Sequence, residues 1–130
     1  AVRVMSRGRS TGNPEFLDAL FDAIDSADAA RFADFLTEDA LFRFGSAPPV
    51  HGRKAIREAV AGFFSSIAGS RHSLRHVWSG PGTLACAGEV SYRRFDGSEI
   101  SLPFADAFEM RDDLISAYRI YIDIAPLYAK

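Results

Sequence analysis

Alternating apolar and polar residues predict β-sheet in the second half of the chain. Between Ile100 and Met110 every even-numbered residue is apolar except Asp106, and the intervening residues are Ser, Pro, Ala, Ala and Glu. This period of two is typical of a strand with one buried face, because successive side chains point to opposite sides. Similar stretches separated by turns predict four antiparallel strands over residues 72–79, 83–95, 98–111 and 114–124.

The first half of the chain has the periodicity of helices. Asn13 is a good N-cap and Pro14 suits a first helical position, so a helix is expected to start there and to end near Asp25. Apolar residues recur at helical spacing again over 28–36 and 53–68, with a short strand expected at 40–44. Three N-terminal helices followed by a four-stranded meander predict an α+β fold. This order favours a strongly curved sheet around the helices and a conical cavity, although a filled core would give the same pattern.

The composition fits one globular domain, which we expect over residues 13–130. Hydrophobic residues make up 48% of the 130 residues, and 11 Phe favour either a large aromatic core or an apolar cavity. The net charge of −2 gives no reason to expect a nucleic-acid partner. The apolar runs are too short to cross a bilayer, so no membrane partner is expected either.

The cysteine count and the N-terminus bear on location. A single cysteine, Cys86, cannot form an intramolecular disulfide and suits a reducing compartment, so we expect the cytoplasm. Residues 1–12 contain three arginines and no acid, and they lack the apolar run of a secretory signal. We expect these residues to form a flexible tail.

Asp106 is the candidate that carries chemistry, because it stands on the apolar face of its strand. An ionised carboxylate is costly there unless it is paired, so the group should find a partner or stay protonated. His72 and His76 share a face of an earlier strand under strict alternation, and either could relay a proton to or from Asp106. Four strand residues separate them by about 13 Å, which is too far for a shared metal ion, so no metal site is expected. Glu89 has small neighbours on its strand and is a further candidate acid.

The chain resembles the SnoaL-like (polyketide cyclase-like) branch of the nuclear transport factor two-like superfamily. The resemblance rests on residues 26–28, 35–40, 51–56, 104–109 and 118–123. It implies a mostly antiparallel, cone-shaped and cystatin-like α+β barrel that dimerises through the convex face of the sheet. Because this fold hosts isomerases, cyclases, dehydratases, epoxide hydrolases and non-catalytic binders, the resemblance leaves the activity open.

Three related enzyme types set different expectations. In the ketosteroid isomerases the proton-donating aspartic acid falls on Asp106, but the oxyanion tyrosine falls on Leu20 and the base on Phe44. In the limonene epoxide hydrolases one acid matches Glu89, whereas the arginine falls on Ala87 and the second acid on Ile120. SnoaL-like cyclases use an aspartate as general base, for which Asp106 matches in place and type. Neither of the first two mechanisms is therefore expected to be complete here.

These observations predict a homodimer with an apolar pocket for a hydrophobic small molecule. The expected chemistry is cofactor-free proton transfer of the isomerase, cyclase or dehydratase type, with Asp106, His72, His76 and Glu89 as candidate catalytic residues. A non-catalytic ligand-binding or dimerisation module on the same fold explains the missing groups as well. The residues expected to line the pocket are Phe16, Leu20, Phe42, Phe44, Phe63, Trp78, Phe104, Phe108, Tyr118 and Ile120.

Overall fold

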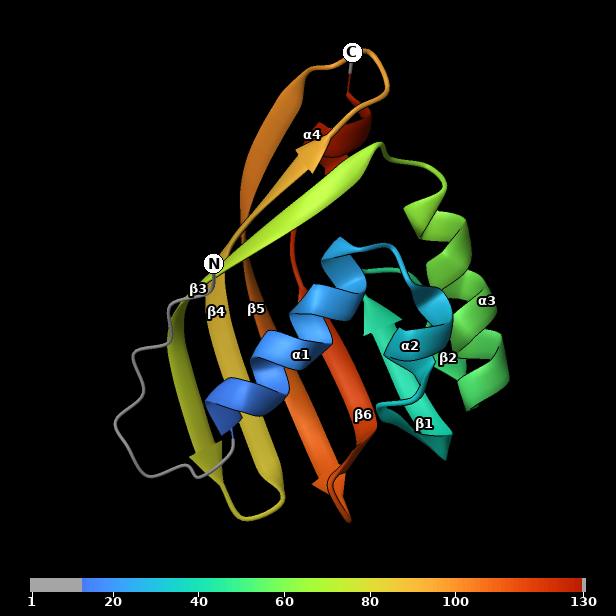
Figure 1. Ribbon diagram of the computed structural model, residues 1–130, viewed down its shortest axis with the longest axis vertical. Coiled ribbons are helices and arrows are strands. Elements are labelled where there is room, and N and C mark those ends of the chain that lie inside the picture. The colour runs from blue at the N-terminus through green and yellow to red at the C-terminus, as the bar shows by residue number, and fades with distance from the viewer. Residues whose placement is uncertain (1–12, 130) are drawn as a thin grey trace.

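One curved sheet with helices on its concave side forms the body of the protein (Figure 1). The computed structural model describes residues 13–129. Its elements in chain order are α1 (Asn13–Asp25), α2 (Ala29–Ala33), β1 (Leu36–Phe44), β2 (Val50–His51), α3 (Arg53–Phe64), β3 (Gly69–Gly80), β4 (Thr83–Arg93), β5 (Glu99–Arg111), β6 (Leu114–Tyr121) and α4 (Ala125–Tyr128). The expected α+β class is confirmed, and the expected tail at 1–12 lies outside the described residues.

The sheet has six strands in the order β2-β1-β6-β5-β4-β3. The meander from β3 to β6 is antiparallel, as its hairpins require, whereas β1 joins β6 in parallel. The strands β2 and β3 form two separate edges, so the sheet is curved and mixed but not closed into a barrel.

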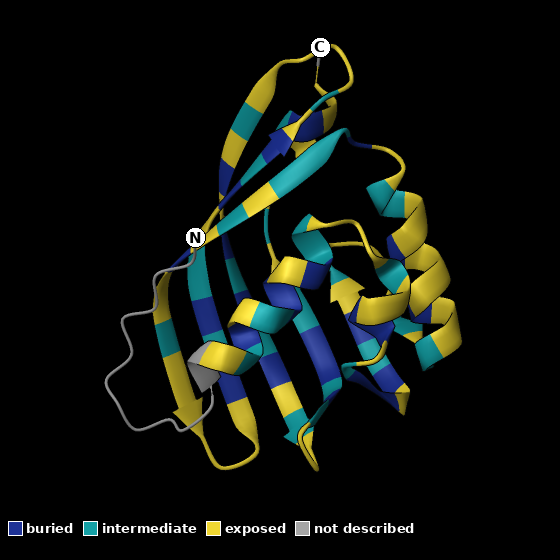
Figure 2. Cartoon of the chain, viewed as in Figure 1, coloured by how far each residue is buried: buried dark blue, intermediate teal, exposed yellow. Residues whose placement is uncertain are grey.

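The helices bury the concave face of this sheet (Figures 1 and 2). The helix α1 crosses in front of the sheet, and α2 and α3 lie together over the β1 end. Buried residues follow the inner side of α1 and the inward positions of the strands, while the outward side of each helix is exposed. Apolar side chains of α1, α3 and all the long strands join one hydrophobic core.

A β-bulge changes the direction in which β3 faces. Leu74 pairs with Gly88 and His76 pairs with Ala87, so Arg75 is the extra residue between them. Gly88 is required at this bend, because an added Cβ would overlap the backbone carbonyl oxygen of Ser73. Side chains of β3 before the bulge and those after it therefore follow opposite parities.

The ends of several elements differ from the expected ones. The strand β1 begins at Leu36 rather than at residue 40, and a two-residue strand lies within the expected 45–52 loop. The last strand ends at Tyr121, and a short C-terminal helix follows it with Pro126 in its first turn. The expected turn at Asp112 and Asp113 is present, with φ of 54° and 67°. No helix within residues 13–129 is both long and apolar enough to cross a membrane.

Candidate functional site

A cavity of about 180 Å³ lies between the helices and the concave face of the sheet. Its wall is mostly apolar and aromatic, and its polar groups are few. The lining residues are Ile24, Phe32, Phe42, Phe44, Ala47, Pro48, Val50, Ala59, Val60, Phe63, Phe64, Ser70, His72, Val90, Tyr92, Phe104, Asp106, Tyr118, Ile120 and Ile122. An apolar hollow with a few convergent polar groups is the usual form of a small-molecule site.

Asp106 forms the first polar group of the cavity. The strand alternation of β5 turns it inward between Phe104 and Phe108, and its residue is only 2% exposed. The hydroxyl of Tyr118 on the neighbouring strand β6 donates a 3.0 Å hydrogen bond to Oδ2 of Asp106. The other oxygen, Oδ1, is buried and has no hydrogen-bond partner among the described residues. A buried oxygen without a partner calls for an explanation, and in a residue that lines a cavity it marks a candidate ligand-binding position.

Burial sets the protonation of this carboxyl group. Removal from water raises the pKa of Asp106 to about 8, and the hydrogen bond from Tyr118 lowers it by a smaller amount. At neutral pH the group is therefore mostly a neutral acid, which can donate a hydrogen bond through its proton. Burial also raises the pKa of the Tyr118 phenol, so that hydroxyl remains a donor.

His72 and Asp25 form the second polar group. Asp25 Oδ1 lies 2.6 Å from His72 Nδ1, and Asp25 Oδ2 accepts a 2.8 Å hydrogen bond from the His72 backbone N–H. The hydroxyl of Ser70 donates a 2.9 Å hydrogen bond to Asp25 Oδ1. A carboxylate on Nδ1 favours the tautomer with the proton on Nδ1, which leaves the lone pair on Nε2. Within residues 13–129, Nε2 has no hydrogen-bond partner and is not sealed from solvent.

The place of Asp25 in its helix is unfavourable by itself. It is the last residue of α1, where the helix dipole disfavours negative charge. The three hydrogen-bonding contacts from β3 compensate for this position and fix the end of the helix against the strand. Asp25 therefore holds the His72 ring in one orientation, with Phe21 against it at a centroid distance of 4.7 Å.

The two polar groups face the same cavity with one aromatic ring between them. His72 is on β3 and Asp106 is on β5, so the strand β4 separates them. The ring of Phe104 contacts the His72 ring edge to face at 5.3 Å, and Phe104 lies two residues from Asp106 on the same face of β5. No hydrogen bond joins His72 to Asp106. Both groups line the same cavity.

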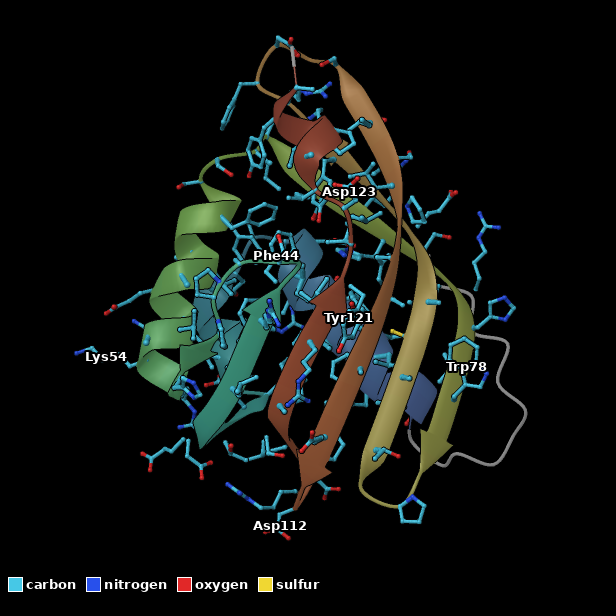
Figure 3. All side chains as sticks on the ribbon, turned by 180° about the vertical axis from the view of Figure 1, so that it is seen from behind. Phe44, Lys54, Trp78, Asp112, Tyr121 and Asp123 are labelled. Atoms are coloured by element: carbon cyan, nitrogen blue, oxygen red, sulfur yellow. The ribbon has the colours of Figure 1, made fainter. Side chains whose placement is uncertain are left out.

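Six of the ten residues expected to line the pocket do so: Phe42, Phe44, Phe63, Phe104, Tyr118 and Ile120. The other four lie elsewhere. Leu20 and Phe108 are fully packed in the core, and Phe16 contacts Phe35 edge to face. Trp78 is 55% exposed on the outer face, because it follows the bulge in β3 (Figure 3).

His76 and Glu89 are not at the cavity, which corrects the expectation from strict alternation. The bulge at Arg75 turns His76 to the convex face, where its ring stacks on that of Trp78 at 5.6 Å. Glu89 has the orientation of its strand neighbours Ala87 and Ser91, and that side of β4 is also the convex one. Its carboxylate lies 3.3 Å from the guanidinium of Arg75 in an exposed pair.

Sequence reasoning missed Asp25, Ser70 and Tyr92 at this site. Asp25 was identified only as the end of a helix, and its partner is 47 residues away. Ser70 and Tyr92 are paired across β3 and β4 and both face inward. The alternation of β4 could have found Tyr92, since it shares the parity of Val90. Burial raises the pKa of its phenol, so its hydroxyl stays protonated.

The arrangement offers acid and base groups rather than a metal centre. No cluster of three His, Cys, Asp or Glu side chains able to hold a metal occurs in the part of the chain that the structure describes. The cavity combines a neutral carboxylic acid with an imidazole whose Nδ1 is held by a carboxylate. An acid and a base that face one ligand can move a proton between two of its atoms.

Comparison with known proteins places this fold in a known class. The model of the SnoaL-like domain matches residues 17–118, and the chain belongs to this family. The structure of TerC co-crystallised with polyporic acid superimposes with a TM-score of 0.78 at 17% identity, over 91% of this chain and 96% of that one. An NTF2-like protein from Anabaena variabilis gives a TM-score of 0.75 at 23% identity, over 92% and 95% of the two chains. An LEH-like epoxide hydrolase from M. tuberculosis gives 0.73 at 13% identity, over 85% and 82%.

Proposed function

We propose that the protein is a cofactor-free acid–base enzyme of the isomerase, cyclase or dehydratase type that acts on a hydrophobic carbonyl compound. The observation that carries the proposal is the unpartnered Oδ1 of Asp106, a buried carboxyl oxygen on the wall of an apolar cavity. Retaining such an atom without a partner costs free energy, on the order of 1–3 kcal/mol for an ordinary polar group. A ligand oxygen in hydrogen-bond contact with it removes this cost.

The proton-transfer step follows from the two polar groups. Nε2 of His72 takes a proton from the carbon next to the substrate carbonyl, and the C–H electron pair forms the enolate double bond. The carbonyl π electrons move to oxygen, where the protonated Oδ1 of Asp106 donates a hydrogen bond to the developing charge. Return of the proton from His72 to another carbon gives isomerisation. Dehydration results when the enolate electrons form a new carbon–carbon double bond and the hydroxyl on the next carbon takes the proton from His72 and leaves as water.

Asp25 and Tyr118 act as positioning residues in this scheme. Asp25 holds His72 through Nδ1 and stabilises the imidazolium that forms when Nε2 is protonated. Tyr118 fixes Oδ2 of Asp106, which leaves Oδ1 to carry the proton toward the cavity. The apolar wall around both groups strengthens these interactions, because little water competes with them.

Solvent deuterium exchange tests this proposal directly. Hydrophobic ketones are incubated with the protein in D₂O, and incorporation at the α-carbon is measured by mass spectrometry. Asp106→Asn should slow exchange by about tenfold or more, since the amide keeps the shape but its N–H is a weaker donor to the developing charge than the carboxylic O–H. His72→Gln should slow it by about 10²-fold.

Two matched controls separate the site from general effects of substitution. Asp39→Asn changes an exposed carboxylate that pairs with Arg111, and His76→Gln changes the outward histidine of the same strand. Both should exchange as fast as wild type. Full exchange in Asp106→Asn, or equal losses in the two histidine variants, would rule the mechanism out.

Ligand binding without turnover is the second candidate function. The Asp106 and His72 groups are not in direct contact, and this geometry suits a binder that recognises a ligand at both ends. Ligand binding that is weakened by Asp106→Asn, together with the absence of exchange for every ketone tested, would favour this function.

We also propose a homodimer through the convex face, in the reducing environment of the cytoplasm that a lone buried Cys86 suits. The outer face of β4 and β5 carries small side chains from Ala85, Ala87, Ala105 and Ala107. Trp78 and Tyr121 beside them are 55% and 58% exposed (Figure 3). Exposed aromatic residues around a flat apolar patch are typical of interfaces. Tyr121→Lys should halve the molecular mass measured by analytical ultracentrifugation, and a wild-type monomer would refute the dimer.

A further inference from the structure

We infer that the cavity selects a neutral molecule with a single six-membered ring and an oxygen group at each end. The inference deepens the proposed function and rests on it, since it concerns the ligand of the same cavity. Three properties of the cavity support it: its volume, the charge of its wall and the placement of its two polar groups on different strands.

The volume favours a ligand with one ring. The cavity measures about 180 Å³, and an apolar protein cavity of about 150 Å³ is known to take up benzene. The additional space suits one or two small substituents. The rings of Phe44, Phe63 and Tyr92 contact one another along one wall in tilted and edge-to-face geometry, with centroid distances of 5.0 and 5.7 Å. Such walls suit a flat ring in offset or edge contact.

The charge of the wall excludes an anionic ligand. No lysine or arginine lines the cavity in the described part of the chain. The two acids nearest the ligand positions are Asp106, which is neutral, and Asp25, which is already occupied by His72 and Ser70. A carboxylate ligand would be desolvated here without a permanent cationic partner, at considerable cost. A neutral ligand avoids this cost.

The ring of Phe104 lies next to one polar group and near the other in the strand. Phe104 lies between them, with its ring in edge contact with His72 and its backbone two residues from Asp106. A ligand ring that lies along Phe104 would place one end at Oδ1 of Asp106 and the other at Nε2 of His72. Oxygen groups in para positions of the ring would satisfy both.

Binding of four phenols and one benzoate tests the inference without any requirement for turnover. Affinities for 4-ethylphenol, 4-(hydroxymethyl)phenol, 2-naphthol, 9-phenanthrol and 4-ethylbenzoate are measured by isothermal titration calorimetry. The single-ring phenols should bind at least about tenfold more tightly than 2-naphthol and 9-phenanthrol, because extra ring atoms overpack the cavity. The benzoate should bind at least about tenfold more weakly than 4-ethylphenol, because its charge has no partner.

Two phenols of nearly equal shape test whether a second ligand oxygen contacts His72. The alcohol in 4-(hydroxymethyl)phenol replaces the terminal methyl of 4-ethylphenol, and it should bind at least as tightly despite its greater polarity. His72→Phe should reverse this order by about tenfold, because the alcohol then faces only apolar groups. Phe63→Ala provides a variant with a larger cavity, and it should bind 2-naphthol more tightly than wild type does.

The outcomes separate this inference from the proposed function. Equal or tighter binding of the two- and three-ring phenols by wild type, or no binding of any phenol, would overturn the inference whether or not ketones exchange deuterium. Equal affinities for 4-ethylbenzoate and 4-ethylphenol would show that the cavity does not select neutral ligands. If His72→Phe left the relative affinities of 4-(hydroxymethyl)phenol and 4-ethylphenol unchanged, the contact between His72 and a second ligand oxygen would be refuted. Selective binding of single-ring phenols together with absent exchange would keep the inference and reject the catalytic mechanism alone.

Discussion

Asp25 and Asp106 are the same side chain in two opposite settings at one cavity. Asp25 is partly exposed at a helix end and accepts hydrogen bonds at both oxygens, from Ser70, from the His72 backbone and from the His72 ring. Asp106 is buried on a strand and accepts one hydrogen bond, from Tyr118, at one oxygen. The first setting provides a carboxylate that orients a base, and the second provides a neutral acid. The surroundings, rather than the residue type, divide the two roles.

The largest expected effect concerns the pH dependence of stability. The unfolded Asp106 carboxyl loses its proton near its ordinary pKa of 3.8, whereas the folded one keeps it up to about pH 8. Between these values the folded state binds more protons, so its stability falls by about 1.4 kcal/mol per pH unit from this group. Urea unfolding at several pH values in this window should show the slope in wild type and lose it in Asp106→Asn. Identical slopes in the two proteins would mean that the buried carboxyl is ionised.

The next effect concerns the stability of the bend at Gly88, on the strand that lies between His72 and Asp106. On β4, Gly88 stands midway between Cys86, which pairs with Asp106, and Val90, which pairs with His72. Gly88→Ala should destabilise the fold by roughly 3 kcal/mol or more, because the new Cβ would overlap the Ser73 backbone. Gly62→Ala on α3 is the control, since nothing lies within 4 Å of its added Cβ. Chemical denaturation measures both, and equal stabilities of the two variants would contradict the bend.

A smaller effect, on the rate of proton exchange, is expected at Asp25, the partly exposed one of the two aspartates. Asp25→Asn keeps an oxygen for the His72 backbone N–H but loses the charge that holds Nδ1–H. The rate of α-proton exchange should fall by about tenfold to a hundredfold, with a loss of about 1 kcal/mol in stability. Asp22→Asn, three residues earlier and paired with Arg31 on the surface, should leave the rate unchanged. An unchanged rate in Asp25→Asn would show that His72 does not depend on its carboxylate.

The smallest expected effect concerns the hydrogen bond from Tyr118 to Asp106 and its influence on the pKa of Asp106. The Tyr118 hydroxyl lowers the pKa of Asp106, so Tyr118→Phe should raise it further. Activity that needs the protonated acid is lost as pH rises through this pKa, and its alkaline limb should therefore move to higher pH, by less than about one unit. Tyr128→Phe changes an exposed tyrosine and should leave the pH profile in place. A shift of the limb to lower pH would contradict the hydrogen-bond assignment.

The sequence predicted what depends on local periodicity. The alternation around Asp106 located β5 and turned the carboxyl inward, because a strand without a bulge keeps its parity over its whole length. The apolar spacing found α1 and α3 for the same reason. The end of the last strand was overestimated, since Ile122 and Ile124 continue the apolar pattern although the ladder stops at Tyr121.

The other parts of the site depend on contacts that periodicity does not encode. Arg75 has no sequence feature that marks it as the extra residue of a bulge, so His76 was expected on the wrong face. The role of Asp25 needs the end of α1 to meet β3, a tertiary contact over 47 residues. Gly88 was the available signal, since a glycine inside a strand often marks a bulge or a close backbone approach.

The bulge in β3 also affects how related sequences can be compared. A relative with the same number of residues in this strand but no bulge would keep one parity along the whole strand, and a histidine aligned with His76 would then face the cavity. Two proteins with the same pair of histidines in an alignment could thus have one or two of them at the site. The pairing of this strand with its neighbour must therefore be known before an aligned histidine in this family is given a role.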